Sequence, residues 1–221
     1  EEKLIIFKSS SSKIKNSQIE YRGKISINPF DLDLKINLDN YKISKLFNIH
    51  PILIEFIKSK LLLNKNISIN TSVDINSNLK NEIFQNAKIN FHIINGKVDF
   101  NGTKFINDKI GSLELSNSNL FFKNDNLLFN SDILINIENS DNLFSFLNTS
   151  KLLRKDLKNI LINLDYNFLT NQIKLNNIKI DNNETNDELR TIAEDFNNNN
   201  RINLNNSRQL INELLKAAYK G

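Results

Sequence analysis

The chain has 221 residues, of which 39% are hydrophobic and 24% are charged, a balance typical of a folded protein rather than a disordered segment. The net charge is only +4 and is spread along the chain, so we expect no nucleic-acid partner. The absence of Cys excludes disulfides, thiolate nucleophiles and thiol metal ligands among these residues. The most apolar run, residues 52–63, is interrupted by charges and is shorter than the roughly 20 residues that span a bilayer.

Asn supplies roughly one residue in five, whereas Gly (5) and Pro (2) are scarce. We therefore predict that Asn and Asp form most of the turns, because their short side chains tolerate left-handed backbone and form local hydrogen bonds. The strongest hairpin signals are Asn95-Gly96 and Asn101-Gly102, followed by residues 124–126 and 170–171. The chain contains no Met, so we expect it to be a part of a longer protein whose N-terminal part precedes residue 1.

The dominant pattern along the chain is an alternation of apolar and polar residues. In residues 30–38 every second side chain is apolar and the others are Asp, Lys or Asn, so a strand here has one dry face and one wet face. The same pattern predicts strands at 24–27, 67–75, 88–94, 97–100, 110–115, 120–122, 127–137, 160–168 and 173–180. Strands at spacings of about 10 residues indicate a long antiparallel meander, and the fold class is mainly β.

Helical patterns are few. An apolar stripe of helical spacing follows Pro51 and extends to Leu61, and a second helix that carries Leu143, Phe144 and Leu147 is predicted to be capped by Ser140 and Asp141. Residues 185–188 form a capping box that opens a third helix, residues 197–200 form a polar linker, and Ser207 opens a last amphipathic helix. We place the one domain boundary near residue 182, which gives a β domain at 1–182 and a helical C-terminal tail at 183–221.

The last helix has two interpretations. Its apolar stripe, which includes Leu210, Ile211, Leu214 and Leu215, either packs over the end of the sheet and protects a bare strand edge, or docks on a membrane or a partner. We favour packing on the sheet.

The sequence offers no constellation of catalytic residues, and we expect no enzyme activity, no cofactor and no metal. His50 and His92 are the only histidines, and His92 lies on the wet side of a predicted strand. The sequence lacks a nucleophile elbow and a Gly-rich phosphate loop. Residues 181–188 resemble a calcium loop but carry Asn186 at the position that requires Gly. Asp31 and Asp33 share the polar face of one strand, where they keep that face wet.

Two passages of the chain resemble the bacterial AsmA-like family of envelope proteins. Residues 21–30 combine a strand with a Pro-Phe turn, residues 31–38 form an alternating strand, and Ile43-Ser44-Lys45-Leu46-Phe47 has the pattern of a short helix of this family. Residues 132–181 resemble the C-terminal region of the family, with the helix Leu143-Phe144-Ser145-Phe146-Leu147, a basic segment around Arg154 and further alternating strands. The final helix, residues 208–221, resembles the tail that closes such proteins.

The resemblance implies a periplasmic protein that an upstream segment anchors in the inner membrane and that supports outer-membrane assembly by moving phospholipid between the membranes. It implies a sheet curled into a groove or open barrel-like trough, with phospholipid acyl chains as ligands and other envelope proteins as further partners. We expect the alternating apolar side chains to line this groove. The candidates are Phe30, Leu32, Leu34, Ile36, Leu38, Ile67, Ile69, Val73, Ile162, Leu164 and Tyr166.

An alternative from another class is a structural or adhesive envelope β-protein without lipid transport. The two functions differ in a way that a structure can test. In a sandwich, Leu32, Leu34 and Ile36 contact a second sheet, whereas in a groove they line an apolar channel.

Overall fold

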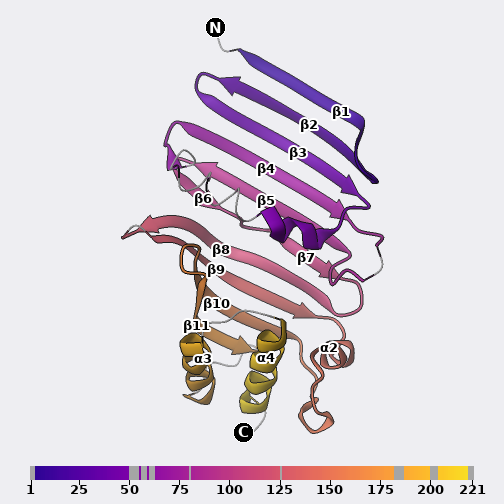
Figure 1. The fold of residues 1–221 in the computed structure, drawn as a ribbon, viewed down its shortest axis with the longest axis vertical. Coiled ribbons are helices and arrows are strands. Elements are labelled where there is room, and N and C mark those ends of the chain that lie inside the picture. Colours follow the sequence, from indigo (N-terminus) through magenta and orange to yellow (C-terminus); the bar gives the residue numbers. More distant parts are fainter. Residues whose placement is uncertain are drawn as a thin grey trace. The chain divides into compact units, whose positions relative to one another are not determined.

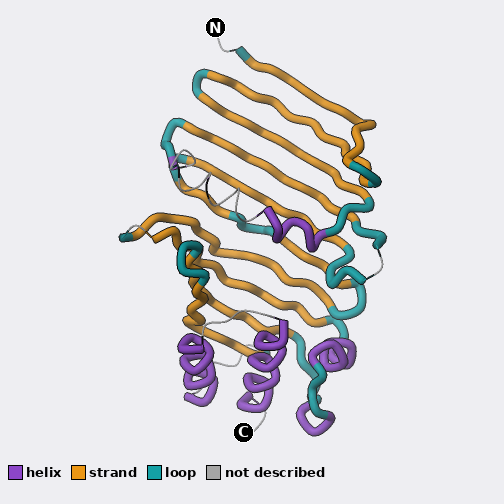
Figure 2. The backbone as a smooth tube through the Cα atoms, viewed as in Figure 1, coloured by secondary structure: helices purple, strands orange, loops and turns teal. Residues whose placement is uncertain are grey.

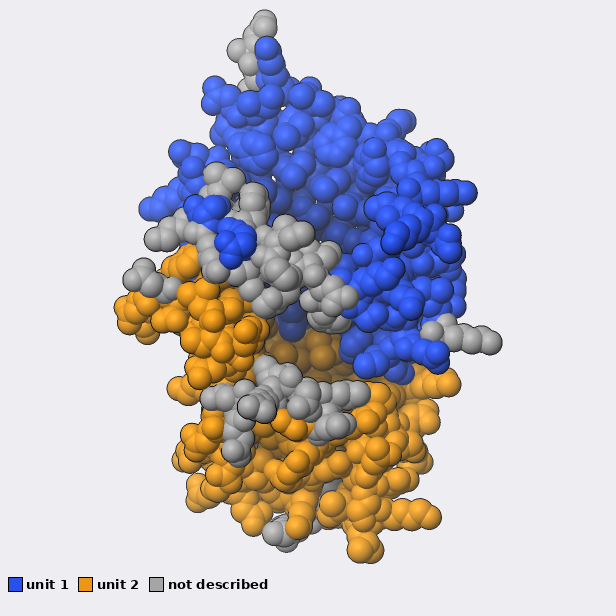
Figure 3. All heavy atoms as spheres, viewed as in Figure 1, with its two compact units in different colours: residues 1–108, 115–121 blue, residues 109–114, 122–221 orange. Residues whose placement is uncertain are grey.

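The computed structural model describes residues 3–49, 55, 59, 63–79, 81–124, 126–181, 187–199 and 204–218. The chain is mainly β, as predicted, with a few short helices and a helical C-terminal region (Figures 1 and 2). It divides into two compact units, coloured separately in Figure 3. Unit 1 comprises residues 1–108 and 115–121, and unit 2 comprises residues 109–114 and 122–221.

Unit 1 is a single layer of strands with one short helix. Its elements are β1 (Leu4–Ile14), β2 (Ser17–Ile27), β3 (Phe30–Asp39), the 3-10 helix η1 (Ile43–Ile49), β4 (Ile67–Asn76), β5 (Asn86–Ile94), β6 (Lys97–Asp99), β7 (Lys104–Asn107) and residues 115–121 of β8 (Gly111–Lys123). The hydrogen-bonded order is β1-β2-β3-β4-β5-β6-β8, and β7 pairs with both β5 and β8. Strand β1 therefore ends this order with one edge that no described strand pairs.

One pair of strands departs from the predicted antiparallel meander. Strands β3 and β4 run parallel, with Phe30 opposite Ile67 and Asp39 opposite Asn76. A parallel neighbour requires the chain to return to the end at which it began, and the long connection that begins with η1 does this. Alternation identifies strands but not the direction in which neighbours run, so the sequence pattern could not distinguish this pair.

The sequence pattern also misjudged three strands. Strand β1 was missed because Ser9 to Ser12 interrupt the alternation, and the structure has a register shift at the same place. Strand β7 has only four residues. The predicted strands at 110–115 and 120–122 are one strand, β8, which passes through the polar residues 116–119. Hydrogen bonds to neighbouring strands keep these residues in a strand although their own sequence does not alternate between apolar and polar.

Asn forms the turns, as predicted. In the described residues, nine non-glycine residues have positive φ, and seven of them are Asn. Asn95 (φ 54°) and Gly96 (φ 73°) are both left-handed, which is the backbone that a two-residue hairpin requires. Asn124 (φ 49°) and Asn171 (φ 54°) confirm the two weaker turn predictions.

Unit 2 packs helices on antiparallel strands. Its elements are β9 (Asn126–Ile137), α2 (Ser140–Leu147), the 3-10 helix η3 (Lys151–Leu153), β10 (Asn159–Asn167), β11 (Gln172–Ile180), α3 (Asp187–Asn199) and α4 (Leu204–Ala218), with the two ends of β8. Strand β10 lies between β9 and β11. The apolar side chains of β10 and β11 form one buried core with those of α2, α3 and α4.

The helices confirm most of the sequence prediction and correct three details. Helix α2 is capped by Asn139, whose side chain accepts from Asn142 N at 2.9 Å, rather than by Ser140 or Asp141. Helix α3 continues through the segment 197–199 that was predicted as a linker, and α4 begins three residues before Ser207. Of the helix predicted after Pro51 the structure describes only Glu55 and Ser59, and its apolar stripe and the capping residue Thr185 lie outside the described residues.

Helix α3 covers part of strand β11. The Asn197 side chain accepts a hydrogen bond from Leu175 N at 2.7 Å and donates one to Leu175 O at 3.1 Å, so its amide pairs the backbone of β11 as a neighbouring strand would. Leu210, Leu214 and Leu215 of the α4 stripe are buried in the same core, as the favoured interpretation of the last helix expects, whereas the edge of β11 is contacted by α3. The tail and β9–β11 thus belong to one compact unit, and the boundary expected near residue 182 does not separate them.

We predict that Leu214→Ala lowers the free energy of unfolding by about 2–5 kcal/mol, because the Leu214 side chain is fully buried in the core that the helices and strands of unit 2 form together. Urea unfolding followed by far-ultraviolet circular dichroism measures the loss. Lys216→Ala on the exposed side of the same helix is the control, with an expected change within about 0.5 kcal/mol. Equal effects of the two substitutions would show that α4 is not part of the core.

Candidate functional site

The register of unit 1 aligns apolar side chains in rows that cross the strands. We call each set of residues that lie opposite one another a column. One column is apolar on every strand that it crosses: Ile5, Ile25, Leu32, Ile69, Ile93, Val98 and Leu120. Opposed residues on neighbouring strands point to the same side of a sheet, so this column is continuous across unit 1.

Two neighbouring columns extend the same surface. One contains Phe7, Gly23, Leu34, Thr71 and Phe91, and the next contains Ser9, Tyr21, Ile36, Val73 and Ile89. We call the surface formed by these columns and their flanking apolar residues the apolar face of unit 1. Aromatic rings add to it: the centroids of Phe7 and Tyr21 are 6.3 Å apart, and those of Phe91 and Phe100 are 5.3 Å apart.

Gly23 leaves room for the Phe7 ring within this surface. A Cβ atom at Gly23 would lie 2.5 Å from Cζ of Phe7 and 2.8 Å from the carbonyl oxygen of Asp33. No side chain fits there, so the Phe7 ring occupies the space that a residue at position 23 would otherwise fill. The gap in the second column is thereby closed by an aromatic ring from the edge strand.

Eight of the predicted lining residues come together on this face. All eight are half-buried, and they lie on the paired strands β3 and β4: Phe30, Leu32, Leu34, Ile36, Leu38, Ile67, Ile69 and Val73. The prediction omitted the residues that β1, β2, β5, β6 and β8 contribute to the same columns. The sequence does not give the register, and only the register shows which residues of separate strands share a column.

One end of the apolar face is a protein core. Ile43 of η1 is buried against Ile75 and Ala87, and Leu38 and Val73 pack against this cluster. Among the described residues of unit 1, no second sheet covers Leu32, Leu34 or Ile36. Unit 1 therefore does not have the sandwich arrangement that would place these three residues between two sheets.

The three lining candidates of β10 have different surroundings. Ile162 and Leu164 belong to the buried core that α2, α3 and α4 complete, so they do not line an accessible surface of unit 2. Tyr166 is partly buried beside the same core, and its hydroxyl donates to Asn171 Oδ1 at 3.0 Å. Burial raises the pKa of Tyr166 above its ordinary value, because the phenolate loses hydration.

The opposite face of unit 1 is polar. Lys24 Nζ lies 3.6 Å from Asp33 Oδ2, and Lys35 Nζ lies 3.1 Å from Asp74 Oδ2. These ion pairs are largely exposed and join neighbouring strands, where each contributes at most about 1 kcal/mol. Asp33 thus keeps the polar face wet, as predicted, and is engaged with a lysine.

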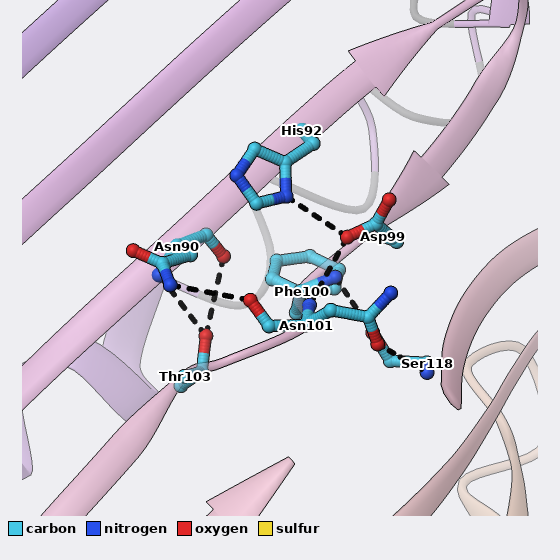
Figure 4. A network of polar contacts seen from close by, with 7 residues as sticks. All are labelled: Asn90, His92, Asp99, Phe100, Asn101, Thr103 and Ser118. Carbon is cyan, nitrogen blue, oxygen red and sulfur yellow. Dashed lines mark hydrogen bonds and ion pairs between the residues drawn. The ribbon is translucent and has the colours of Figure 1, made fainter. Parts of the chain in front are cut away.

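His92 belongs to a network of polar contacts on strands β5, β6 and β8 (Figure 4). Its Nδ1 lies 2.9 Å from Asp99 Oδ1, which also accepts a hydrogen bond from Asn101 N at 3.0 Å. Ser118 Oγ accepts from Phe100 N at 2.7 Å and donates to Asn101 Oδ1 at 3.1 Å. The serine therefore bonds to the turn rather than to the imidazole, and the network holds the Asn101-Gly102 turn in place.

Thr103 closes this network on the other side of the turn. Its buried hydroxyl accepts from Asn90 N at 3.0 Å and donates to Asn90 O at 3.2 Å, and the Asn90 side chain donates to Asn101 O at 3.2 Å. In this way a single hydroxyl replaces a pair of ladder bonds where β5 passes from its pairing with β6 to its pairing with β7.

The described helices include none that is both long and apolar enough to cross a membrane. Within the same residues, no group of three or more His, Asp and Glu side chains is arranged to hold a metal ion.

Comparisons with known proteins identify no family. No protein-family model matches the chain, and no curated protein matches it. Among solved structures, a match is the crystal structure of the sex pheromone staph-cAM373 precursor, with 13% sequence identity and a TM-score of 0.24. The match covers 80% of this chain, and the chain spans 64% of that protein. A likeness of this size carries no argument about fold or function.

We predict that Thr103→Val lowers the free energy of unfolding by about 1–3 kcal/mol, because it leaves the backbone N–H of Asn90 without its acceptor. Thermal and urea unfolding measure the change. Thr71→Val is the matched control: Thr71 lies on the apolar face, and the described residues provide no hydrogen-bond partner for its side chain, so its change should stay within about 0.5 kcal/mol. A neutral Thr103→Val would show that the hydroxyl does not support the turn.

Proposed function

We propose that the apolar face of unit 1 binds the acyl chains of phospholipid, and that the chain is a non-enzymatic lipid-binding segment of a bacterial envelope protein. The observation that carries this proposal is the column from Ile5 to Leu120, which remains apolar across all of the strands that it crosses. On β1 to β4 the column residues Ile5, Ile25, Leu32 and Ile69 are exposed or half-buried, whereas Ile93, Val98 and Leu120 are fully buried. A monomeric domain seldom leaves such an apolar column partly exposed unless a ligand or partner contacts it.

The dimensions of the face support an acyl ligand. Neighbouring strands lie about 4.8 Å apart, so the four strands from β1 to β4, whose column residues are exposed or half-buried, extend roughly 14 Å along a column. One leaflet of a bilayer has a hydrocarbon thickness of about 15 Å, half of the roughly 30 Å of the whole core, so this part of a column nearly matches the length of an acyl chain in one leaflet.

The chemistry of the face supports binding without specific polar contacts. Each methylene group removed from water contributes about 0.8 kcal/mol, and the columns offer aliphatic and aromatic side chains in place of water. Half-buried side chains such as Leu32, Leu34 and Ile36 retain surface that a ligand would cover. Selectivity for one headgroup would then have to come from polar residues outside the columns.

We further propose a periplasmic location, with attachment to the inner membrane through an upstream segment and contacts to other envelope proteins in outer-membrane assembly. This part of the proposal rests on the resemblance of residues 21–47 and 132–181 to AsmA-like proteins.

A structural or adhesive role is the second candidate. Strand β1 has a free edge among the described strands, and Leu4 and Ile6 expose 57% and 76% of their surface there. Exposed apolar residues on an unpaired edge favour contact with another strand. Leu4 and Ile6 lie opposite Ser26 and Lys24, so a strand added at this edge would extend the sheet without any need for lipid on the apolar face.

Native mass spectrometry of the purified chain under gentle conditions tests the proposal, with co-purified phospholipid as the expected result. We predict that Leu32→Asn weakens binding of a fluorescent phospholipid about tenfold or more, because it puts an amide in the middle of the apolar column. Ile94→Asn is the control, since Ile94 is 56% exposed and lies on the polar side of β5.

Circular dichroism and unfolding midpoints must show that both variants remain folded. A lipid-free wild-type spectrum, or equal affinity of the wild type and Leu32→Asn, would favour the structural role and reject acyl binding on this face.

A further inference from the structure

Three cations lie directly opposite one another on the polar face of unit 1. Lys8 of β1 is opposite Arg22 of β2, and Arg22 is opposite Lys35 of β3. All three are exposed. We call this row the cation ladder. Its Cβ atoms are about 5 Å apart from strand to strand, because directly opposed residues of neighbouring strands are held at that spacing.

Like charges placed opposite one another destabilise a sheet, so the ladder opposes folding unless something offsets it. Lys35 is offset by Asp74, whose Oδ2 lies 3.1 Å from Lys35 Nζ. For Lys8 and Arg22 the described part of the chain provides no ion pair with a carboxylate. Two adjacent positive charges are therefore left uncompensated in a protein whose overall charge is only +4.

The ladder forms a common wall of two grooves on the polar face. The first groove, of about 500 Å³, adds Ser9, Ser10, Glu20, Tyr21 and Asn37 to the three cations. The second, of about 570 Å³, adds the polar residues Lys24, Asp33, Asn70 and Ser72, and Ile6, Phe7, Gly23 and Leu34 also line it. In the second groove the one carboxylate is already engaged by Lys24 at 3.6 Å and by Asn70 Nδ2 at 3.5 Å. The second groove thus has four cations against one paired carboxylate.

We propose that this second groove is an anion site that takes a phosphate group, held by Arg22 with Lys8 and Lys35 on either side. The guanidinium of Arg22 presents two parallel N–H donors, which match two oxygens of one phosphate. The Ser72 hydroxyl and the Asn70 amide line the same groove and supply neutral donors. A dianion here would cancel the repulsion between Lys8 and Arg22.

The cations of the site lie on the opposite side of the sheet from the apolar face, because residues 22 and 35 alternate with Tyr21, Gly23, Leu34 and Ile36. The site therefore stands independently of acyl-chain binding. The shared chemistry is a phosphate monoester or diester, which either a soluble phosphorylated compound or a lipid headgroup can present.

Arg22→Gln tests the site, with titration calorimetry of inorganic phosphate against the purified chain at constant ionic strength. We predict that this variant binds phosphate about tenfold more weakly than the wild type, since it loses the paired charge-assisted hydrogen bonds. Arg22→Lys should lie between the two, because it keeps the charge but loses the fork. Lys13→Gln, an equal change of charge on β1 outside both grooves, should remain within about twofold of the wild type.

A second readout separates binding from a structural role. Without phosphate, Arg22→Gln should unfold at the same temperature as the wild type or higher, because repulsion is relieved. Phosphate should raise the unfolding temperature of the wild type more than an equal ionic strength of chloride does, and should not do so for the variant. If Arg22→Gln does not fold, Lys8→Gln on the edge strand serves in its place with the same expectations.

Two sets of vesicles distinguish the sources of the phosphate. If vesicles containing phosphatidic acid compete with inorganic phosphate for the wild type and neutral phosphatidylcholine vesicles do not, the ligand is a headgroup; competition by soluble phosphate esters alone identifies a soluble ligand. Either result supports the site. The proposal is overturned if the wild type does not bind phosphate, or if Arg22→Gln and Lys13→Gln weaken binding equally.

Discussion

The pleat of the β-strand is the constraint on which this structure depends. Side chains alternate between two faces, and the hydrogen-bond register decides which residues of neighbouring strands meet. In unit 1 the register of five consecutive strand pairings keeps the apolar residues in common columns, from Ile5 on β1 to Val98 on β6. A shift of one residue in any of these pairings would move the apolar residues of one strand to the polar face. The apolar face therefore exists only if every one of these pairings keeps its register.

The same alternation has different consequences in the two units. In unit 2 the apolar residues of β10 and β11 are covered by α2, α3 and α4, which bury Leu214 and Leu215 completely. In unit 1 the short helix η1 packs at the end marked by Ile75 and Ala87, and the column residues of β2, β3 and β4 such as Ile25, Leu32 and Ile69 stay half-buried. Covered strands give a stable core, whereas a half-buried apolar row keeps the capacity to bind another apolar surface. This contrast is the physical basis for placing the candidate site in unit 1.

The polar face of unit 2 carries hydrogen bonds from amide side chains to carboxylates. In unit 2, Asn130 and Asn176 donate to Asp165 at 2.8 and 2.9 Å, and Asn163 donates to Asp132 at 2.6 Å, so neighbouring strands are joined by hydrogen bonds between side chains. An amide can donate and accept at once, and it costs less to desolvate than a charge. Against this background the cation ladder of unit 1 is exceptional, because its charges repel one another where an amide would have been neutral or favourable.

Alternation and turn chemistry are local properties, so the sequence by itself determined the features that follow from them. These features are the mainly β class, the strand from Phe30 to Leu38, the left-handed turns at Asn95 and Asn171, and the apolar stripe of α4. Only the tertiary structure decided which strands are neighbours, that β3 and β4 run parallel, and that Ile162 and Leu164 are buried beneath helices while Leu32 and Leu34 stay half-buried. It also decided that Lys8, Arg22 and Lys35, which are far apart in the sequence, form one row. The reason is that a strand's pattern specifies two faces but not its neighbours, since pairing depends on register and on long connections between residues distant in the chain.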